Sequence, residues 1–239
     1  MTWEIEYGQK LRSAEAALRA VESGMRVYIQ PGCAEPETLV EALLKRAPFV
    51  HDVEVVHMLT LGSAAYVAPE MAGHFRHNAM FIGANVREAI NDGRADYTPV
   101  YLSEIEELFE SGAMPLDVAL IEVSPPDSHG YCSFGVSVDT TLTAAKYARY
   151  VVAQVNDQMP RTYGDSFIHV NQIDAFVESS RPLCELPTAE ITGLHKAIAR
   201  NVAGLIDDGA VIQTGIGGLP DAVLPCLMDR KDLGVHTEL

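Results

Sequence analysis

The chain has 239 residues, of which 48% are apolar and 21% are charged. This apolar content can build a sizeable core and excludes an intrinsically disordered chain. The formal net charge is −16 and the pI is near 4.8, which argues against nucleic acid or an anionic membrane as a partner. An anionic ligand would have to be held by local backbone N–H groups or by single Arg and Lys side chains.

The sequence shows no signal for export or membrane insertion. It begins Met-Thr-Trp-Glu-Ile-Glu, without the basic and apolar regions of a secretory signal. No apolar run approaches the roughly 18 residues that a spanning helix needs. The cysteines are far apart and lack a zinc-type or Cys-x-x-Cys spacing (Cys33, Cys132, Cys184 and Cys226). We therefore expect free thiols and a cytoplasmic location.

Helical and strand patterns alternate along the first three quarters of the chain. Apolar residues at helical spacing predict a helix over about 7–23, which ends at Gly24, and another over about 37–46. A capping box at 103–106 predicts the start of a short helix. Runs rich in β-branched residues predict strands, over 25–29, 53–59, 80–83, 118–123 and 150–155. This alternation predicts an α/β fold with a mainly parallel open sheet and flanking helices.

A proline-containing stretch without periodicity, 179–187, predicts a domain boundary. We expect residues 1–185 to form one α/β domain and 188–239 to be the beginning of a second, truncated one. In the second region the pattern predicts five elements in order. They are a long amphipathic helix over 188–207, a strand over 210–213, a glycine-rich turn, a helix from 220 to about 228 and a short strand over 233–235. About fifty residues are too few for a complete independent domain.

The glycine-rich turn offers unshielded backbone N–H groups between a strand and a helix that begins at Pro220. Such a turn can hold an anion, and Glu238 follows the next strand at the edge where open α/β sheets bind ligands. The pattern Gly215-x-Gly217-x-x-Pro220 is similar to the dinucleotide fingerprint but lacks its third glycine. From the residues alone, a tight strand-to-helix turn without a ligand also stays open.

Three other motifs favour ordinary structure over chemistry. The Asp127-Ser128-His129 run could supply a hydrolytic triad, but it lacks a Gly-x-Ser-x-Gly elbow and its flanking prolines are typical of a turn. His74-x-x-His77 has no matched cysteine or carboxylate, so we expect no metal site. Cys33 has no visible activating neighbour, so a reactive thiol is the less favoured reading.

Three segments together resemble the acetyl-CoA hydrolase/transferase family, namely 117–130 (DVALIEVSPPDSHG), 213–223 (QTGIGGLPDAV) and 234–238 (GVHTE). The likeness covers essentially the whole chain and the amino-terminal half of the family's proteins. Within the family it is nearest to the 4-hydroxybutyrate and butyrate–acetate CoA-transferases. The family fold has two comparable α/β domains, so the resemblance implies that most of the second domain lies outside this sequence, with its later glycine-rich CoA contacts.

The resemblance implies the roles of particular residues. Glu238 matches the nucleophile that forms a glutamyl-CoA thioester. Gln213 and Gly32, the latter in the loop over 31–36, match substrate contacts. The residues that match coenzyme A contacts are Gly215, Ile216, Gly217, Gly218 and Leu219.

The implied reaction is ping-pong transfer of CoA between an acyl-CoA and a small carboxylic acid of the acetate, butyrate or 4-hydroxybutyrate class. It needs coenzyme A as a substrate and no prosthetic group or metal, and the family likeness implies a homo-oligomer, a dimer. Three alternatives stay open: an acyl-CoA hydrolase, an inactive CoA-binding remnant, and a nicotinamide-dependent dehydrogenase.

Overall fold

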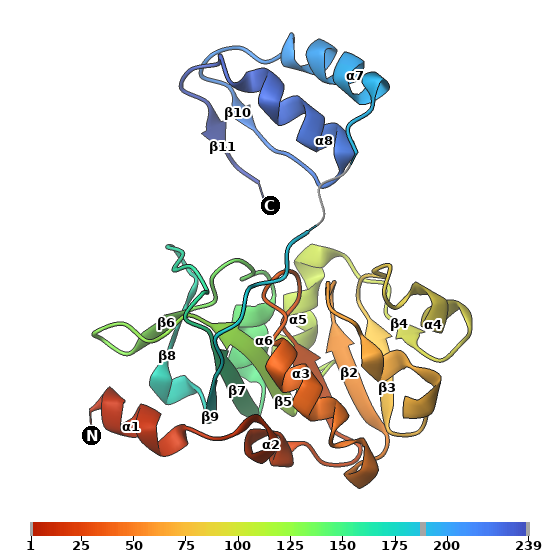
Figure 1. Ribbon diagram of the computed structural model, residues 1–239, viewed down its shortest axis with the longest axis vertical. Helices are drawn as coiled ribbons and strands as arrows, with labels where there is room; N and C mark the ends of the chain where they lie inside the picture. The colour runs from red at the N-terminus through yellow and green to blue at the C-terminus, as the bar shows by residue number, and fades with distance from the viewer. Residues whose placement is uncertain (1, 187–189, 238–239) are drawn as a thin grey trace. The chain divides into compact units, whose positions relative to one another are not determined.

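A seven-stranded sheet, with every neighbouring pair parallel, forms the centre of the first unit (Figure 1). The computed structural model describes residues 2–186 and 190–237, and the chain divides into two compact units, Met1–Glu185 and Leu186–Leu239. In spatial order the strands are β4 (Asp96–Tyr97), β3 (Phe75–Ala79), β2 (Val53–His57), β1 (Arg26–Ile29), β5 (Val118–Val123), β7 (Tyr150–Val155) and β9 (Ala175–Glu178). The predicted α/β fold with a parallel open sheet is confirmed.

Helices cover both faces of this sheet (Figure 1). One apolar cluster packs Val27 and Ile29 of β1 with α3, and a second packs Tyr28 with α5 on the other face. Because both faces are covered, all six residues of β5 are buried, as is typical of a parallel sheet. The helices of this unit are α1 (Trp3–Lys10), α2 (Ala14–Ala17), α3 (Glu37–Leu44), α4 (Arg87–Asn91), α5 (Ile105–Glu110) and α6 (Thr141–Tyr147).

Smaller elements complete the first unit. Strands β6 (Tyr131–Ser133) and β8 (Phe167–His169) form a separate antiparallel pair. Short 3-10 turns connect the larger elements, at Leu18–Ala20, Ala47–Phe49, Ala65–Val67, Pro69–Met71, Leu102–Glu104 and Val170–Gln172. No helix within the described ranges is both long enough and apolar enough to cross a bilayer.

The second unit contains two helices and a two-stranded parallel sheet. Its elements are α7 (Gly193–Ala203), β10 (Val211–Ile212), α8 (Gly218–Val223), a 3-10 turn at Leu224–Leu227, and β11 (Gly234–Val235). Thr192 caps α7 by accepting a hydrogen bond from the N–H of His195 at 3.2 Å. At the other end of α7 the Arg230 guanidinium donates to the carbonyls of Ala203 and Ile206. Both ends of this helix are thus capped by side chains.

The predicted first helix is interrupted, which corrects the expectation of one helix over 7–23. It ends at Lys10, and a second helical segment begins at Ala14 behind the capping side chain of Ser13. Between them Leu11 forms a parallel bridge with Phe176 of β9, and the N–H of Arg12 donates to the Phe176 carbonyl at 2.8 Å. Backbone pairing with an exposed sheet edge therefore overrides the helical periodicity.

Other expected boundaries also need correction. The strand expected over 80–83 lies earlier, at β3, because the strand runs through polar residues that periodicity did not mark. The capping box expected at Ser103 is absent: Leu102–Glu104 is a 3-10 turn, and α5 begins behind Glu104 without a side-chain cap. The helix expected over 188–207 is α7, which is shorter, and residues 187–189 lie outside the described residues. Strands β4, β6, β8 and β9 were not expected.

Two histidines are buried in the sheet of the first unit. His57 ends β2 and His77 lies in β3, and their rings stack with centroids 4.0 Å apart. The Nε2 atom of His57 hydrogen-bonds the Tyr66 hydroxyl at 2.6 Å, and Nδ1 of His77 hydrogen-bonds the Val55 carbonyl at 2.8 Å. Burial lowers the pKa of His77 to about 4 and that of His57 well below its usual value. Both rings are therefore neutral in the folded protein at neutral pH.

We expect this pair to make the fold sensitive to acid. The pKa of His77 is lower in the folded state than in the unfolded one, so its contribution is complete above pH 6.5 and is lost as the pH falls toward 4. The loss is on the order of 3 kcal/mol for this one group. His77→Gln should therefore reduce the pH dependence of the unfolding free energy, measured by urea denaturation between pH 7.5 and 4. His129→Gln, at an exposed histidine, should leave it unchanged, and an equal pH dependence in both variants would contradict the assignment.

The second unit is expected not to fold as an isolated peptide. Its described residues bury few apolar side chains, namely Ala199, Ala203, Ala222 and Leu227, and a two-stranded sheet is marginal at best. We expect a peptide of residues 190–239 to give the far-ultraviolet circular dichroism of an unfolded chain, while residues 1–185 unfold cooperatively. A cooperative melting transition of the peptide would contradict this.

Candidate functional site

The strand order of the first unit reverses between β1 and β5. From β1 the chain builds outward through β2 and β3 to β4, and from β5 it builds the other way through β7 to β9. The two central strands are parallel neighbours, with Ile29 opposite Leu120. Open α/β sheets bind ligands in the crevice beyond the carboxyl ends of such a pair. This edge, here called the switch edge, is the candidate site of the first unit.

The loop that follows β1 at the switch edge carries Gly32. Its N–H donates to the Leu59 carbonyl at 2.6 Å, and its φ of +65° is one that side chains other than glycine rarely adopt. A Cβ there would lie 3.0 Å from Oγ of Ser137. Backbone conformation and close approach both call for glycine at this position, whether or not it contacts a substrate.

A buried carboxylate supports the same loop. Glu35 is only 3% exposed, and its Oε2 accepts a hydrogen bond from the N–H of Gly62 at 2.7 Å. Burial raises the pKa of Glu35, and the Gly62 N–H opposes that rise. The loops after β1 and β2 are therefore joined through this carboxyl.

A second buried carboxyl lies at the end of β5. Glu122 is 2% exposed and accepts hydrogen bonds from the side-chain amides of Gln154 and Asn156. Burial raises its pKa to about 7, although both amide donors lower it. A group whose pKa is shifted close to neutrality by its surroundings is typical of functional sites. Sequence reasoning missed Glu122, although a single acid inside the apolar run of β5 is a visible signal.

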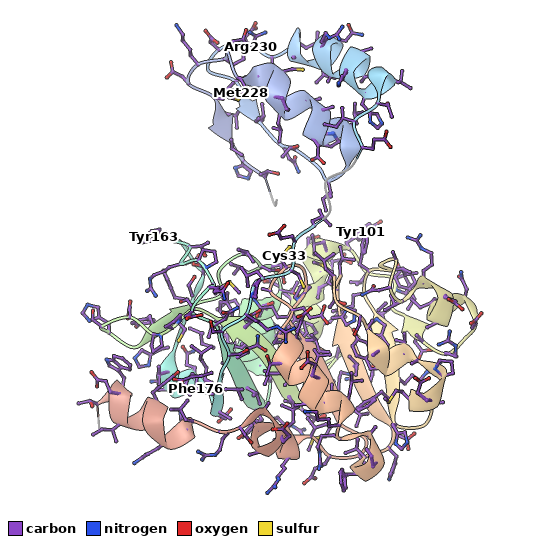
Figure 2. The ribbon with its side chains drawn as sticks, in the orientation of Figure 1. Cys33, Tyr101, Tyr163, Phe176, Met228 and Arg230 are labelled. Atoms are coloured by element: carbon purple, nitrogen blue, oxygen red, sulfur yellow. The ribbon has the colours of Figure 1, made fainter. Side chains whose placement is uncertain are left out.

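An open hollow of about 440 Å³ lies above the same loops, in the first unit. Figure 2 labels Cys33 where the loop after β1 reaches this end of the sheet. The lining residues come from this loop, from the loops after β6 and β7, and from the end of the unit: Cys33, Val136, Gln158, Pro182, Leu183, Cys184 and Glu185. The lining is mostly thiol and apolar, with Gln158 and Glu185 as its polar side chains.

The glycine-rich turn of the second unit follows β10, as expected. Gly217 has a φ of +119° and precedes α8, which begins at Gly218 rather than at Pro220. Among the described residues, nothing accepts a hydrogen bond from the backbone N–H groups of Gly215 to Leu219. Ile216 is 59% exposed. The turn therefore presents unpaired backbone donors that could receive an anionic or carbonyl oxygen.

The end of β11 is fastened to the beginning of this turn. The Thr237 hydroxyl donates to the Thr214 carbonyl at 2.9 Å, and the Thr214 N–H donates back to that hydroxyl at 3.4 Å. Thr214 directly follows Gln213, and Thr237 directly precedes Glu238. Glu238 itself lies outside the described residues. The geometry thus brings the chain segments that contain Gln213, the glycine turn and residue 237 together within the second unit.

The other sequence motifs form ordinary structure. Oδ1 of Asp127 accepts hydrogen bonds from the N–H groups of His129 and Tyr131, so this run is a turn closed by an aspartate side chain. His74 hydrogen-bonds the Val50 carbonyl, while His77 is buried against His57. In the part of the chain that the structure describes, no three His, Cys, Asp or Glu side chains gather as a metal-ligand set.

The sequence model of one protein family, the acetyl-CoA hydrolase/transferase N-terminal domain, matches residues 1–185. The chain belongs to this family. It is 50% identical over its full length to 4-hydroxybutyrate coenzyme A transferase of Clostridium kluyveri, covering 56% of that protein. It is 33% identical to butyryl-CoA:acetate CoA-transferase of Anaerostipes caccae, again over the whole chain and 55% of the relative.

Two solved structures share the fold of this chain over all or nearly all of its length. RipA from Yersinia pestis is 33% identical, with a TM-score of 0.93 over the whole chain and 58% of its own. The 4-hydroxybutyrate CoA-transferase of Porphyromonas gingivalis is 37% identical, with a TM-score of 0.85 over 99% of this chain and 56% of its own. The chain therefore spans about half the length of the curated relatives that it matches.

The contact between Glu35 and Gly62 gives a test of how the switch edge is packed. A Cβ on Gly62 would lie 2.6 Å from Glu35 Oε2, and the buried carboxyl has little room to move. Gly62→Ala should lower the unfolding free energy by about 2 kcal/mol, and adding the shorter Glu35→Asp should restore part of it. Gly8→Ala, where nothing lies within 4 Å, is the control. Urea denaturation measures all three, and a Gly62→Ala protein as stable as the control would contradict the packing.

Proposed function

We propose that this protein transfers CoA between an acyl-CoA and a small carboxylic acid through a glutamyl-CoA thioester on Glu238. The observation that carries the proposal is the row of backbone N–H groups from Gly215 to Leu219, which have no acceptor among the described residues and lie beside the strand end that leads to Glu238. The 50% identity to a 4-hydroxybutyrate coenzyme A transferase supports it. We also propose that the acids belong to the acetate, butyrate or 4-hydroxybutyrate class and that the protein forms a homodimer.

The reaction needs a carboxylate nucleophile and a cradle for oxyanions. The Glu238 carboxylate attacks the thioester carbonyl of the acyl-CoA, which gives a mixed anhydride and releases CoA as a thiolate. The thiolate then attacks the glutamyl carbonyl, so that a glutamyl-CoA thioester forms and the first acid leaves as a carboxylate. A second carboxylate attacks this thioester and the steps run in reverse. Charges and atoms balance at each step without a redox or metal group.

Other residues of the chain would bind the substrates and stabilise the oxyanions. Each carbonyl addition creates an oxyanion, and the N–H groups of Gly215 to Leu219 are donors that could receive it; losing one such donor typically costs about 3 kcal/mol of barrier. Those donors can also hold coenzyme A, which matters in a chain with a net charge of −16. Gln213 and Gly32 remain our proposed substrate contacts.

Acyl-CoA hydrolysis is the second candidate function. The glycine turn is open to solvent within the second unit, with Ile216 59% exposed, and a thioester that water can reach is hydrolysed rather than passed on. Release of CoA without an acceptor acid would favour this activity. Release only with an acceptor acid would favour transfer.

Chemical trapping tests the nucleophile directly. The protein is incubated with an acyl-CoA and then treated with borohydride, which reduces a thioester to the alcohol, and the peptide containing residue 238 is analysed by mass spectrometry. We expect the reduced side chain at Glu238 only after acyl-CoA treatment. The Glu238→Ala variant should show no reduced side chain at this position, and any transfer rate should fall by about 10³-fold or more. The Glu110→Gln variant, at an exposed acid on α5, should keep both the reduction at Glu238 and the transfer rate. Label on another carboxyl, or full activity of Glu238→Ala, would contradict the proposal.

A further inference from the structure

The switch edge rests on a layer of polar side chains that are as buried as the apolar core. Gln30, Gln154 and Asn156 are 0% exposed and Glu122 is 2% exposed. They come from three neighbouring strands, at or just beyond the carboxyl ends of β1, β5 and β7. Polar groups cost free energy when they leave water unless they are hydrogen-bonded, so this layer must be satisfied internally.

The Glu122 residue is at the centre of this layer. Its Oε1 accepts from Gln154 Nε2 at 2.9 Å and from Asn156 Nδ2 at 2.8 Å, and its backbone N–H donates to Gln30 Oε1 at 2.6 Å. Gln30 Nε2 in turn donates to the Ser137 carbonyl at 2.7 Å. Among the described residues no hydrogen bond reaches the second carboxyl oxygen of Glu122, so this oxygen is free to carry a proton.

Through the two amides, the layer holds the segments that surround the site. Oε1 of Gln154 accepts from the backbone N–H of Thr38, in the first turn of α3, directly behind the loop that carries Gly32. Asn156 Nδ2 donates to the Arg181 carbonyl at 2.8 Å, and the Arg181 N–H donates back to Asn156 Oδ1 at 3.4 Å. The start of α3, which follows the loop after β1, and the segment that closes the first unit are thus both hydrogen-bonded to side chains that bond Glu122.

The charges around Glu122 act in opposite directions. Arg181 favours its ionised form and Glu37, on α3, disfavours it, while the Arg181 guanidinium is itself paired with Glu37 and Glu41. The side chains that face it from β1 and β7 are neutral amides. Burial is the largest effect and raises the pKa of Glu122 to about 7. A carboxyl in this position changes charge near neutral pH while it is only 2% exposed to water.

We propose that Glu122 is a positioning residue, whose neutral form holds the Gly32 loop, the start of α3 and segment 179–181 together at the switch edge. Ionisation places a negative charge inside the buried layer, at a cost in free energy that its hydrogen bonds and Arg181 only partly offset, and opening of these segments to water relieves this cost. The way the loop is held does not depend on the transfer reaction. The consequence for substrate binding rests on the proposed function, through the role given to Gly32.

Hydrogen exchange on the full chain tests how the segments are held. After correction for intrinsic exchange rates, we expect the protection of the Thr38, Glu122 and Arg181 amides to fall by tens of fold as the pH rises from 5 to 8.5. The reason is that Glu122 in the opened segments would titrate near its ordinary pKa. In Glu122→Gln, which keeps the acceptor oxygen but cannot ionise, this fall should disappear. Glu110→Gln should behave as the unchanged protein. An equal fall in Glu122→Gln and in the unchanged protein would overturn the proposal.

A second measurement needs no variant. The carboxyl carbon-13 resonance of Glu122 in labelled protein should titrate near pH 7, and titration near pH 4.5 would overturn the proposal even if Glu122→Gln failed to fold. Where CoA transfer is measurable, the KM for the acceptor acid should rise above pH 7 in the unchanged protein and stay flat in Glu122→Gln, with little change in kcat. A rise that persists in Glu122→Gln would contradict the positioning role. If trapping at Glu238 fails while the exchange and titration results hold, the proposed function falls and the structural role of Glu122 stands.

Discussion

The reversal of strand order between β1 and β5 is the constraint on which the first unit depends. Because the two central strands are parallel and their connections build in opposite directions, their carboxyl ends open a crevice that the strands themselves cannot fill. The sequence places at this crevice a loop that needs glycine at position 32 and two buried carboxyls, Glu35 and Glu122. Hydrogen bonds from backbone and amide groups replace the water that these carboxyls lose, so the edge is both ordered and polar.

A strongly acidic protein must bind anionic substrates against its own field. For the anionic substrates that we propose, the structure offers backbone N–H groups: those of Gly215 to Leu219 are unpaired among the described residues. Backbone N–H donors are held in place by the fold and do not titrate. They therefore suit an oxyanion that forms and disappears within each proposed reaction cycle. Arg181, by contrast, is already committed to Glu37 and Glu41.

Part of the fold could be predicted because some of its strands are mostly apolar. The limits expected for 118–123 and 150–155 match β5 and β7, where both faces are buried and β-branched residues dominate. The strand β3 was misplaced because His77 and Asn78 are polar, and their hydrogen bonds to β2 form only in the folded sheet. The break at Leu11 depends on Phe176, far along the chain. Of the candidate site, the Gly32 loop and the glycine turn were visible as local patterns, whereas the Glu122 layer joins residues from three strands and is not.

A crystal structure of the protein with bound coenzyme A is the sharpest test of the proposed thioester on Glu238, because that thioester requires the sulfur atom to lie at one place. We expect the thiol sulfur within contact distance of the Glu238 carboxyl, with the N–H groups of Gly215 to Leu219 bonded to the bound molecule. A well-ordered coenzyme A with its sulfur far from residue 238, and with the glycine turn unoccupied, would contradict it.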